Sequence, residues 1–365
     1  MKNILLICNS SNNVINFRKE LIIQLIEQKY EVSIISSDNN RIKEIENLGA
    51  KCFVCKYNNR STNPFSLLKT INRFTKVIRN VLPDIIFTFQ ITPNILGNKA
   101  ARKAKVSNVF SMVEGTGDPF EGDTFIRRIV RFFVCHLYRS AFKKTKKVFF
   151  LNKESRDEFI QRHIVKEDQT ILIPGIGIDV DNISLSDSVP VEKSIVSLSR
   201  LKTGKGIIDY CKIAEEVRKT RKDISFHLYG EEIDITKKEL TPFIDNNCIV
   251  YKRYTNKPLD VIRNSRLLVL CPYYKEGFPR TILEAMAVGR PTIATNIVGC
   301  KDAVVDGQTG YLLEPHDIKG FANKIIEIID NDKLLLELGK NAREVCEKKF
   351  DSKIINSKII EIISE

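Results

Sequence analysis

The feature that most constrains the fold of this chain is a regular alternation of short apolar runs with longer amphipathic segments. In the first half, six apolar runs rich in β-branched residues lie at 4–8, 32–35, 52–55, 85–89, 109–112 and 147–151. Helical patterns lie between most of these runs, at 18–28, 64–80 and 94–104. Such β-α alternation predicts an α/β fold, in which helices cover both faces of a parallel sheet.

The alternation stops at 174–191, a polar stretch that we interpret as a linker, and then starts again. Strand patterns follow at 194–198, 225–229, 248–251, 267–270, 292–295 and 310–313, and helical patterns at 206–219, 280–288, 318–329, 333–347 and 352–363. A chain of 365 residues is too long for one ordinary core. We therefore predict two doubly wound domains, 1–175 and 190–350, and a last helical segment, 351–365. Facing domains of this kind bind ligands in a cleft at the carboxyl ends of their strands.

The composition of the chain limits the classes of possible binding partner but does not select one of them. Charged residues make up 28% of the chain and apolar residues 43%, which is an ordinary globular balance. The formal net charge of +13 suits nucleic acid, anionic lipid or a phosphorylated ligand. Nine scattered cysteines indicate reduced thiols, and the apolar runs are too short to span a bilayer. We expect a cytoplasmic protein, peripheral on the inner face of the cell membrane.

The most informative stretch joins the apolar run 267–270 to the helical pattern 280–288 through a loop that ends in Glu276, Gly277, Phe278 and Pro279. Backbone N–H groups near Gly277, Phe278, Arg280 and Thr281 can point at an anion, and the helix dipole adds to this attraction. Proline is tolerated at the first turn of a helix, and glycine lets a backbone approach a ligand closely. This loop is a candidate site for a diphosphate.

Two glutamates flank that candidate site. Glu276 lies in the loop, where its carboxylate can accept hydrogen bonds from sugar hydroxyls, and Glu284 lies inside the helix, within reach of a ribose. Two glutamates at this separation would equally fit solvated charges around an ordinary helix start. The full string of strand, loop and helix is far more specific than either carboxylate alone.

A second basic motif opens the same half of the chain. Arg200 and Lys205 flank the turn between the strand pattern 194–198 and the helical pattern that follows. Two cations there can neutralise a diphosphate while its bond to a sugar breaks, which removes the need for a metal ion. A basic surface loop is the alternative interpretation.

These motifs resemble those of family 4 of the retaining glycosyltransferases, and the resemblance covers nearly the whole chain. Further similar strings lie at 174–179, 298–304 and 306–312. The N-terminal half is similar to a narrower group that builds bacterial capsule, O-antigen and glycoprotein glycans on polyprenyl diphosphate, through strings at 16–18, 61–65, 92–97 and 114–117.

The resemblance implies a GT-B fold, with two facing Rossmann-like domains and a C-terminal helix that crosses back to the first. Arg200 and Lys205 match the diphosphate-binding cations of the family, Glu276 the residue that holds the donor sugar, and Glu284 the residue that holds the ribose. The implied reaction is retaining transfer, by front-face attack, of a hexose or N-acetylhexosamine from a nucleotide sugar to a polyprenyl-diphosphate-linked glycan. UDP is the nucleotide that the family uses most.

The chain departs from the family in two loops. The first loop, 9–13, lacks the glycines that many members carry there. Many members also place a histidine on the N-terminal side of the cleft, and the nearest candidate in this chain is Glu114. Glu114 could contact the donor sugar, orient the acceptor hydroxyl or be a structural loop residue.

The segment 125–147 mixes aromatic residues with cations, among them Arg127, Arg128, Arg131 and Phe132. A basic helix with an apolar face can lie on anionic lipid, although it can also be a core helix with a solvated basic face. Two other functions stay open from sequence: a nucleotide-sugar epimerase of the same architecture, and a basic nucleic-acid-binding protein. For the latter, no recognition module is evident in the sequence.

Overall fold

The computed structural model describes residues 2–58, 61, 63–120, 122, 124–274 and 277–365. Contacts divide the chain into two compact units, each of which is described by itself. The first unit contains the residues up to Ile176 together with Ser352–Glu365, and the second is Gly177–Asp351. The division falls inside the stretch 174–191 that we interpret as a linker.

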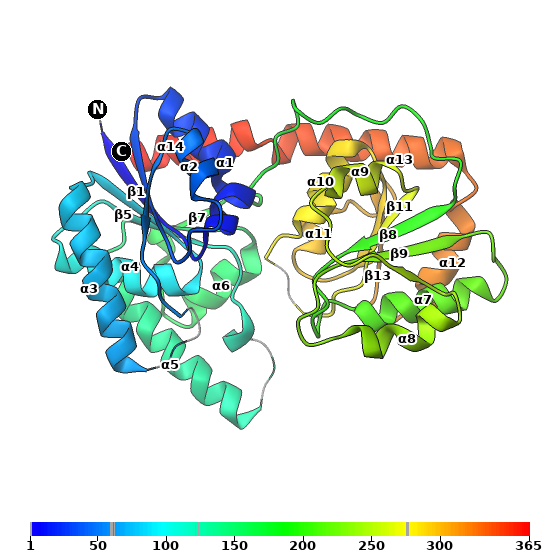
Figure 1. The fold of residues 1–365 in the computed structure, drawn as a ribbon, viewed down its shortest axis with the longest axis horizontal. Coiled ribbons are helices and arrows are strands. Elements are labelled where there is room, and N and C mark those ends of the chain that lie inside the picture. The colour runs from blue at the N-terminus through cyan, green and yellow to red at the C-terminus, as the bar shows by residue number, and fades with distance from the viewer. Residues whose placement is uncertain (1, 59–60, 62, 121, 123, 275–276) are drawn as a thin grey trace. The chain divides into compact units, whose positions relative to one another are not determined.

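The first unit contains a seven-stranded sheet with the order β3-β2-β1-β4-β5-β6-β7, in which every pairing is parallel (Figure 1). The strands are β1 Asn3–Ile7, β2 Glu31–Ser36, β3 Lys51–Val54, β4 Ile85–Phe89, β5 Val109–Val113, β6 Lys147–Phe150 and β7 Thr170–Leu172. Ile4, Leu5, Leu6 and Ile7 are all fully buried, which explains why β1 is a continuous apolar run. The sequence did not predict β7, because this edge strand has only three residues, none of them buried.

Helices cover both faces of this sheet. They are α1 Ser11–Glu27, α2 Ile42–Asn47, α3 Pro64–Val81, α4 Ile91–Lys103, α5 Phe125–Phe142, α6 Lys153–Gln161 and α14 Ser352–Ser364. Neighbouring contacts place α1 against α2 and α14, and α4 against α3 and α5. α1 begins earlier than the predicted start at 18, because the Ser10 side chain accepts a hydrogen bond from Asn13 N and caps the helix. The last helix, α14, belongs to the first unit, where Tyr30 and Ser364 share a hydrogen bond of 2.8 Å.

The second unit contains a six-stranded parallel sheet with the order β10-β9-β8-β11-β12-β13. Its strands are β8 Ser194–Leu198, β9 Ser225–Tyr229, β10 Val250–Tyr251, β11 Leu267–Leu270, β12 Thr292–Thr295 and β13 Gly310–Leu313. Its helices are α7 Ile207–Arg218, α8 Lys237–Asp245, α9 Pro258–Arg263, α10 Arg280–Val288, α11 Cys300–Ala303, α12 Ile318–Ile328 and α13 Asp332–Val345.

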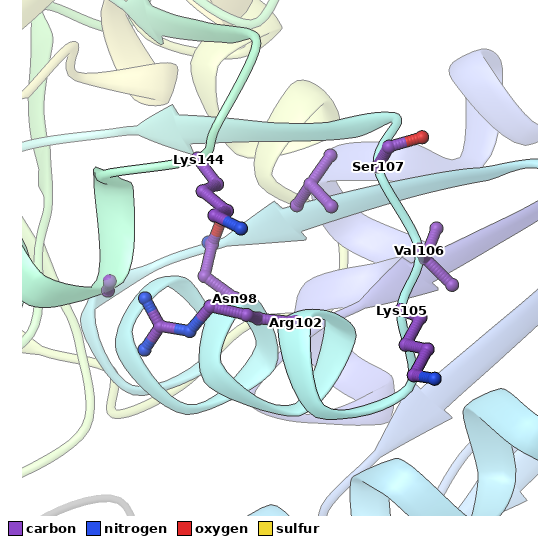
Figure 2. Close-up of a pocket in the computed structure, with 8 residues that line it drawn as sticks. Asn98, Arg102, Lys105, Val106, Ser107 and Lys144 are labelled. Atoms are coloured by element: carbon purple, nitrogen blue, oxygen red, sulfur yellow. The ribbon is translucent and has the colours of Figure 1, made fainter.

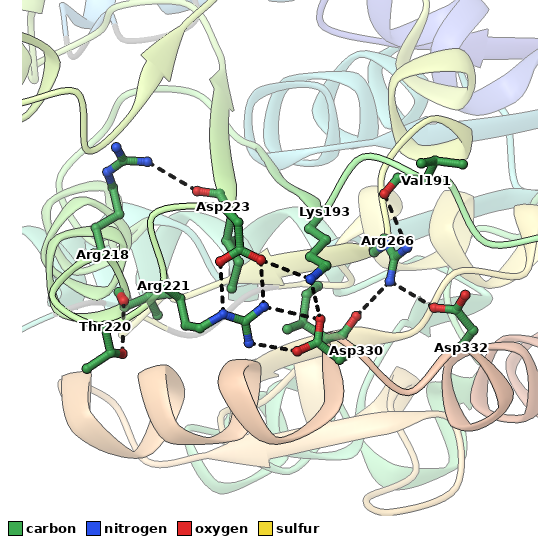
Figure 3. Close-up of polar contacts among 12 residues, drawn as sticks. Val191, Lys193, Arg218, Thr220, Arg221, Asp223, Arg266, Asp330 and Asp332 are labelled. Atoms are coloured by element: carbon green, nitrogen blue, oxygen red, sulfur yellow. Dashed lines mark hydrogen bonds and ion pairs between the residues drawn. The ribbon is translucent and has the colours of Figure 1, made fainter.

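A polar cluster anchors the segment that enters β8 (Figure 3). Arg266 is 6% exposed, and its guanidinium donates to the carbonyls of Pro190 and Val191 at 2.7 and 3.3 Å. The same guanidinium pairs with Asp332 at 2.8 Å. Beside it, two cations, Lys193 and Arg221, both contact two carboxylates, Asp223 and Asp330. The end of the linker is therefore fixed to the second unit.

Both sheets reverse their strand order at one point. In the first unit the reversal lies between β1 and β4, and in the second between β8 and β11. Open α/β sheets bind ligands at the carboxyl ends of the strands beside such a switch point. Each unit therefore has one edge at which functional residues are expected.

Candidate functional site

The structure brings the two predicted motifs of the second unit together at its switch point. The turn that follows β8 carries Arg200 and Lys205, and the segment that follows β11 begins at Cys271. Tyr273 N donates to the carbonyl of Gly204 at 2.9 Å, so the two segments are in direct contact. The sequence predicted each motif separately, and the adjacent pairing of β8 with β11 joins them.

Two glycines make this contact possible. Gly204 and Gly206 have φ values of 92° and 68°, in the left-handed region that other residues rarely adopt. A Cβ on Gly206 would lie 1.7 Å from the carbonyl oxygen of Cys271. Only glycine lets the turn approach the end of β11 so closely.

The turn itself is fixed by backbone hydrogen bonds. Leu201 N donates to Glu231 O at 2.8 Å, and Thr203 N donates to the carboxylate of Asp234 at 2.6 Å. Arg200 is exposed and Lys205 is half-buried. A fixed turn that presents two cations at the switch point is suited to binding an anionic group.

The helix α10 begins at Arg280, and Pro279 precedes it as the N-cap rather than lying inside the first turn. The positive end of the helix dipole therefore lies at Arg280 and Thr281, next to Gly277. The ring of Phe278 packs on Phe350 with 5.2 Å between centroids, and Phe278 is half-buried. Glu276, predicted to hold the donor sugar, lies outside the described residues.

Glu284 lies in the second turn of α10 and is only 7% exposed. Burial raises the pKa of its carboxyl, and the nearby Arg280 guanidinium opposes that shift. Arg280 Nε donates to Glu284 Oε1 at 3.1 Å. A carboxylate among apolar neighbours adds little to stability, and perturbed groups of this kind are typical of functional sites.

Two residues at this edge, His316 and Asp209, were not singled out from sequence. His316 follows β13, and its Nδ1 lies 2.7 Å from Asp209 Oδ2 in the first turn of α7. The His316 ring also packs against Tyr273, with centroids 4.7 Å apart. These residues share no local pattern, so only the fold shows that they are neighbours of the Gly204 turn.

At the switch point of the first unit, Glu114 follows β5 and Gln90 follows β4. Gln90 Nε2 donates to Glu114 Oε2 at 2.9 Å, and Arg18 forms an ion pair with Glu114 Oε1. The Glu114 side chain keeps 22% of its surface exposed. The sequence singled out Glu114, but the partners that hold it come from distant segments.

The N-terminal half of α5 combines cations with exposed apolar side chains. Phe125 and Phe132 are 77% and 64% exposed. A cavity of about 340 Å³ is lined by four arginines together with Phe132 and Cys135; the arginines are Arg128, Arg131, Arg139 and Arg162. Arg127 lies on the same helix, outside this lining. The helix therefore offers positive charge and apolar surface together.

A second cavity of the first unit, of about 290 Å³, lies where α4 ends and β5 begins (Figure 2). Arg102 and Lys144 line it, together with the buried Asn98. Arg102 also donates to the carbonyl of Ser140 near the end of α5. Cations at helix C-termini are explained by the negative end of the helix dipole, so this cavity needs no ligand to account for its charge.

Metal sites and membrane spans were sought in the part of the chain that the structure describes. Within it, no three histidine, cysteine, aspartate or glutamate side chains gather as they would around a metal ion. Among the same residues, no helix combines the length and the apolar character that crossing a bilayer requires.

Comparison with known proteins identifies the family. The model for glycosyl transferases group 1 matches residues 186–345, and the model for glycosyl transferase 4-like proteins matches residues 3–152. A Campylobacter jejuni N,N'-diacetylbacillosaminyl-diphospho-undecaprenol alpha-1,3-N-acetylgalactosaminyltransferase is 26% identical, over 96% of this chain and 95% of that protein. The Escherichia coli UDP-Gal:alpha-D-GlcNAc-diphosphoundecaprenol alpha-1,3-galactosyltransferase is 24% identical, over 87% of this chain and 85% of that one.

Solved structures show the same fold. HepE from Anabaena, crystallised with UDP and glucose, superposes with a TM-score of 0.82 at 18% identity, and the match covers 100% of both chains. The two parallel sheets with their switch points are therefore those of the GT-B architecture. The predicted fold class and enzyme class are both confirmed, and the chain belongs to the family 4 glycosyltransferases with the GT-B fold.

Proposed function

We propose that this enzyme transfers a hexose or N-acetylhexosamine from a UDP-sugar to a polyprenyl-diphosphate-linked glycan, with retention of the anomeric configuration. The observation that carries the proposal is the contact between the Arg200–Lys205 turn and the segment after β11, which leads to α10. The names of the Campylobacter and Escherichia relatives, which specify diphospho-undecaprenol acceptors, support the acceptor class.

In this proposal the second unit holds the donor. Arg200 and Lys205 bind the diphosphate and neutralise the charge that develops as its bond to the sugar breaks. The dipole of α10 acts on the same group, and Glu284 accepts hydrogen bonds from the ribose. Glu276 holds the donor sugar, a role that rests on its place in the motif alone. With two cations at the diphosphate, the reaction needs no metal ion.

The proposed chemical step is a front-face displacement. The acceptor hydroxyl oxygen forms the new bond to the anomeric carbon on the side from which the diphosphate leaves. The bond between that carbon and the diphosphate oxygen breaks, and the departing oxygen takes the proton of the hydroxyl. The positive groups at Arg200, Lys205 and the start of α10 stabilise the charge on the leaving diphosphate.

We assign the lipid end of the acceptor to the first unit. Neither α3 nor α5, each of 18 residues, contains an aspartate or a glutamate, although each carries four arginines or lysines. Exposed Phe125 and Phe132 add apolar surface to α5, and its cavity adds clustered guanidinium groups. Such a surface fits the inner, anionic face of a membrane and the phosphates of a lipid-linked acceptor.

The test of the reaction is an assay of the purified chain with a panel of nucleotide sugars and a synthetic polyprenyl-diphosphate-linked sugar. We expect transfer from one UDP-sugar, and an α-anomer product from an α-linked donor by NMR. An inverted product would refute the retaining mechanism. An epimerised donor formed without any acceptor would replace the proposal by the epimerase function.

The membrane assignment has its own test, co-sedimentation with vesicles of increasing phosphatidylglycerol content. Replacing Arg128 and Arg131 by glutamate should reduce binding at least tenfold, because each cation near an anionic surface contributes about 1 kcal/mol. The matched control replaces the exposed Lys237 and Lys238 of α8 by glutamate, with the same change in charge. Equal losses in both variants, or binding that ignores the lipid charge, would contradict the assignment.

A further inference from the structure

At the switch point of the first unit, four residues are joined in series by polar contacts that the packing of this unit does not require. The series starts at Arg18 on α1, passes through Glu114 after β5 and Gln90 after β4, and ends at Asn9 after β1. Gln90 Oε1 accepts from Asn9 N at 3.2 Å, while its Nε2 donates to Glu114. Three strand ends are thus tied to one carboxylate at the edge where ligands bind.

Arg18 is 3% exposed, which is unusual for a guanidinium. Its Cζ lies 4.2 Å from the centroid of the Phe89 ring, and its Nη1 donates to the carbonyl of Phe17 at 2.9 Å. Burial of an ion pair such as Arg18 with Glu114 brings little net stability, since apolar side chains of similar size could fill the space. We therefore infer that the ion pair between Arg18 and Glu114 has a role other than stabilising the fold.

Gln90 adds a second, independent observation. Its φ is 67° with ψ at 169°, a conformation that is strained for any residue with a Cβ. Glycine would relieve this strain, and yet the position holds a side chain whose two amide atoms both make hydrogen bonds. Strained residues of this kind persist where the surrounding structure needs the side chain in one place.

We propose that Arg18 and Gln90 are positioning residues that hold the Glu114 carboxylate so that it accepts a hydrogen bond from a hydroxyl of the acceptor sugar. Oε1 is buried against Arg18, so the capacity for a ligand lies with Oε2, which has two lone pairs and accepts one hydrogen bond, from Gln90. The exposed part of the Glu114 side chain is where that ligand binds. This inference rests on the proposed function, and it commits Glu114 to the acceptor rather than to the donor.

The test uses the full chain with the donor and the acceptor found active in the panel assay. The main variant is Gln90→Gly, because glycine suits the backbone and folding should not suffer. A hydrogen bond to a charged group corresponds to roughly a tenfold to hundredfold effect. We expect the acceptor KM to rise about tenfold, while UDP affinity and the slow hydrolysis of the donor by water stay within twofold. Gln161→Ala, at the exposed end of α6, is the control.

A double-substitution cycle separates positioning from independent structural effects. If Gln90 acts through Glu114, Gln90→Gly should add nothing further in a Glu114→Ala background. Arg18→Lys keeps the positive charge but not the reach of the guanidinium, and it should raise the acceptor KM in the same way. Additive effects, an unchanged acceptor KM in Gln90→Gly, or a loss that appears equally in donor hydrolysis would each overturn the inference. If the wild-type chain transfers sugar to no acceptor, the proposed function itself has failed.

Discussion

Substitution of Gly206 by alanine tests the packing on which the proposed donor site depends. The new Cβ would lie 1.7 Å from the carbonyl oxygen of Cys271, whereas ordinary contact begins near 3.4 Å. That oxygen belongs to the backbone at the end of β11, so it cannot rotate away. The two segments would have to separate, and the turn that carries Lys205 would move with them.

The magnitude follows from two contributions. A left-handed φ of 68° costs a residue with a Cβ about 1–2 kcal/mol. Overpacking against a fixed neighbour costs roughly 1–3 kcal/mol. We therefore expect Gly206→Ala to lower the free energy of unfolding of the second unit by about 3 kcal/mol, and the melting temperature by about 6–12 °C.

A matched control separates the two contributions. Gly307 has nearly the same φ, 71°, but a Cβ there would meet nothing within 4 Å. Gly307→Ala should therefore lose only about 1–2 kcal/mol, and its UDP affinity should equal that of the wild type. Calorimetry measures both melting transitions, and isothermal titration with UDP measures both affinities. Equal destabilisation by the two substitutions would refute the close approach of the turn to β11.

Three further outcomes follow from the structure. Replacing Arg200 and Lys205 together by alanine should weaken UDP binding by roughly a hundredfold in titration, whereas Lys219→Ala, at the other end of α7, should leave it unchanged. Because burial raises the pKa of Glu284, its folded form takes up a proton before its unfolded form as pH falls. The unit should thus lose stability as pH rises through that window, and urea unfolding of Glu284→Gln should lack this slope. Arg266→Ala removes the donor to the carbonyls of Pro190 and Ile329, the second of which makes a buried bond, and should lower the free energy of unfolding by about 3 kcal/mol.

Much of the fold could be predicted because each core strand appears in the sequence as a short local pattern of apolar residues. Parallel strands buried on both faces are continuous apolar runs, so β1 and β11 were evident. β7, which was not predicted, lies at a sheet edge and has three residues, too few for a periodic signal. The edge strand β10 has only two residues, and it lies within the predicted run 248–251. The start of α1 was missed because its first turn consists of serine and asparagine, which favour caps and loops over helix interiors.

The residues of the candidate sites also fall into those that a local pattern predicts and those that it does not. Arg200, Lys205 and α10 were predictable, because each belongs to a contiguous string with a fixed place beside a strand. The Arg18 to Glu114 pair and the His316 to Asp209 pair join segments far apart in the chain. No period or spacing encodes such pairs. The first pair follows from the strand order of the first sheet, which places the ends of β1, β4 and β5 side by side, and the second pair lies within the second unit.

The charges at the two switch points support a division of work between the units. In the second unit, Arg200, Lys205 and the start of α10 gather positive charge, which suits a diphosphate and would not select a neutral hydroxyl. In the first unit, Glu114 presents a carboxylate, which accepts from a hydroxyl and would repel a diphosphate. UDP affinity should therefore respond to substitutions in the second unit alone, and acceptor KM to those at Gln90. If Gln90→Gly weakened UDP binding as much as loss of Lys205, this division would be wrong, and Glu114 would have to contact the donor.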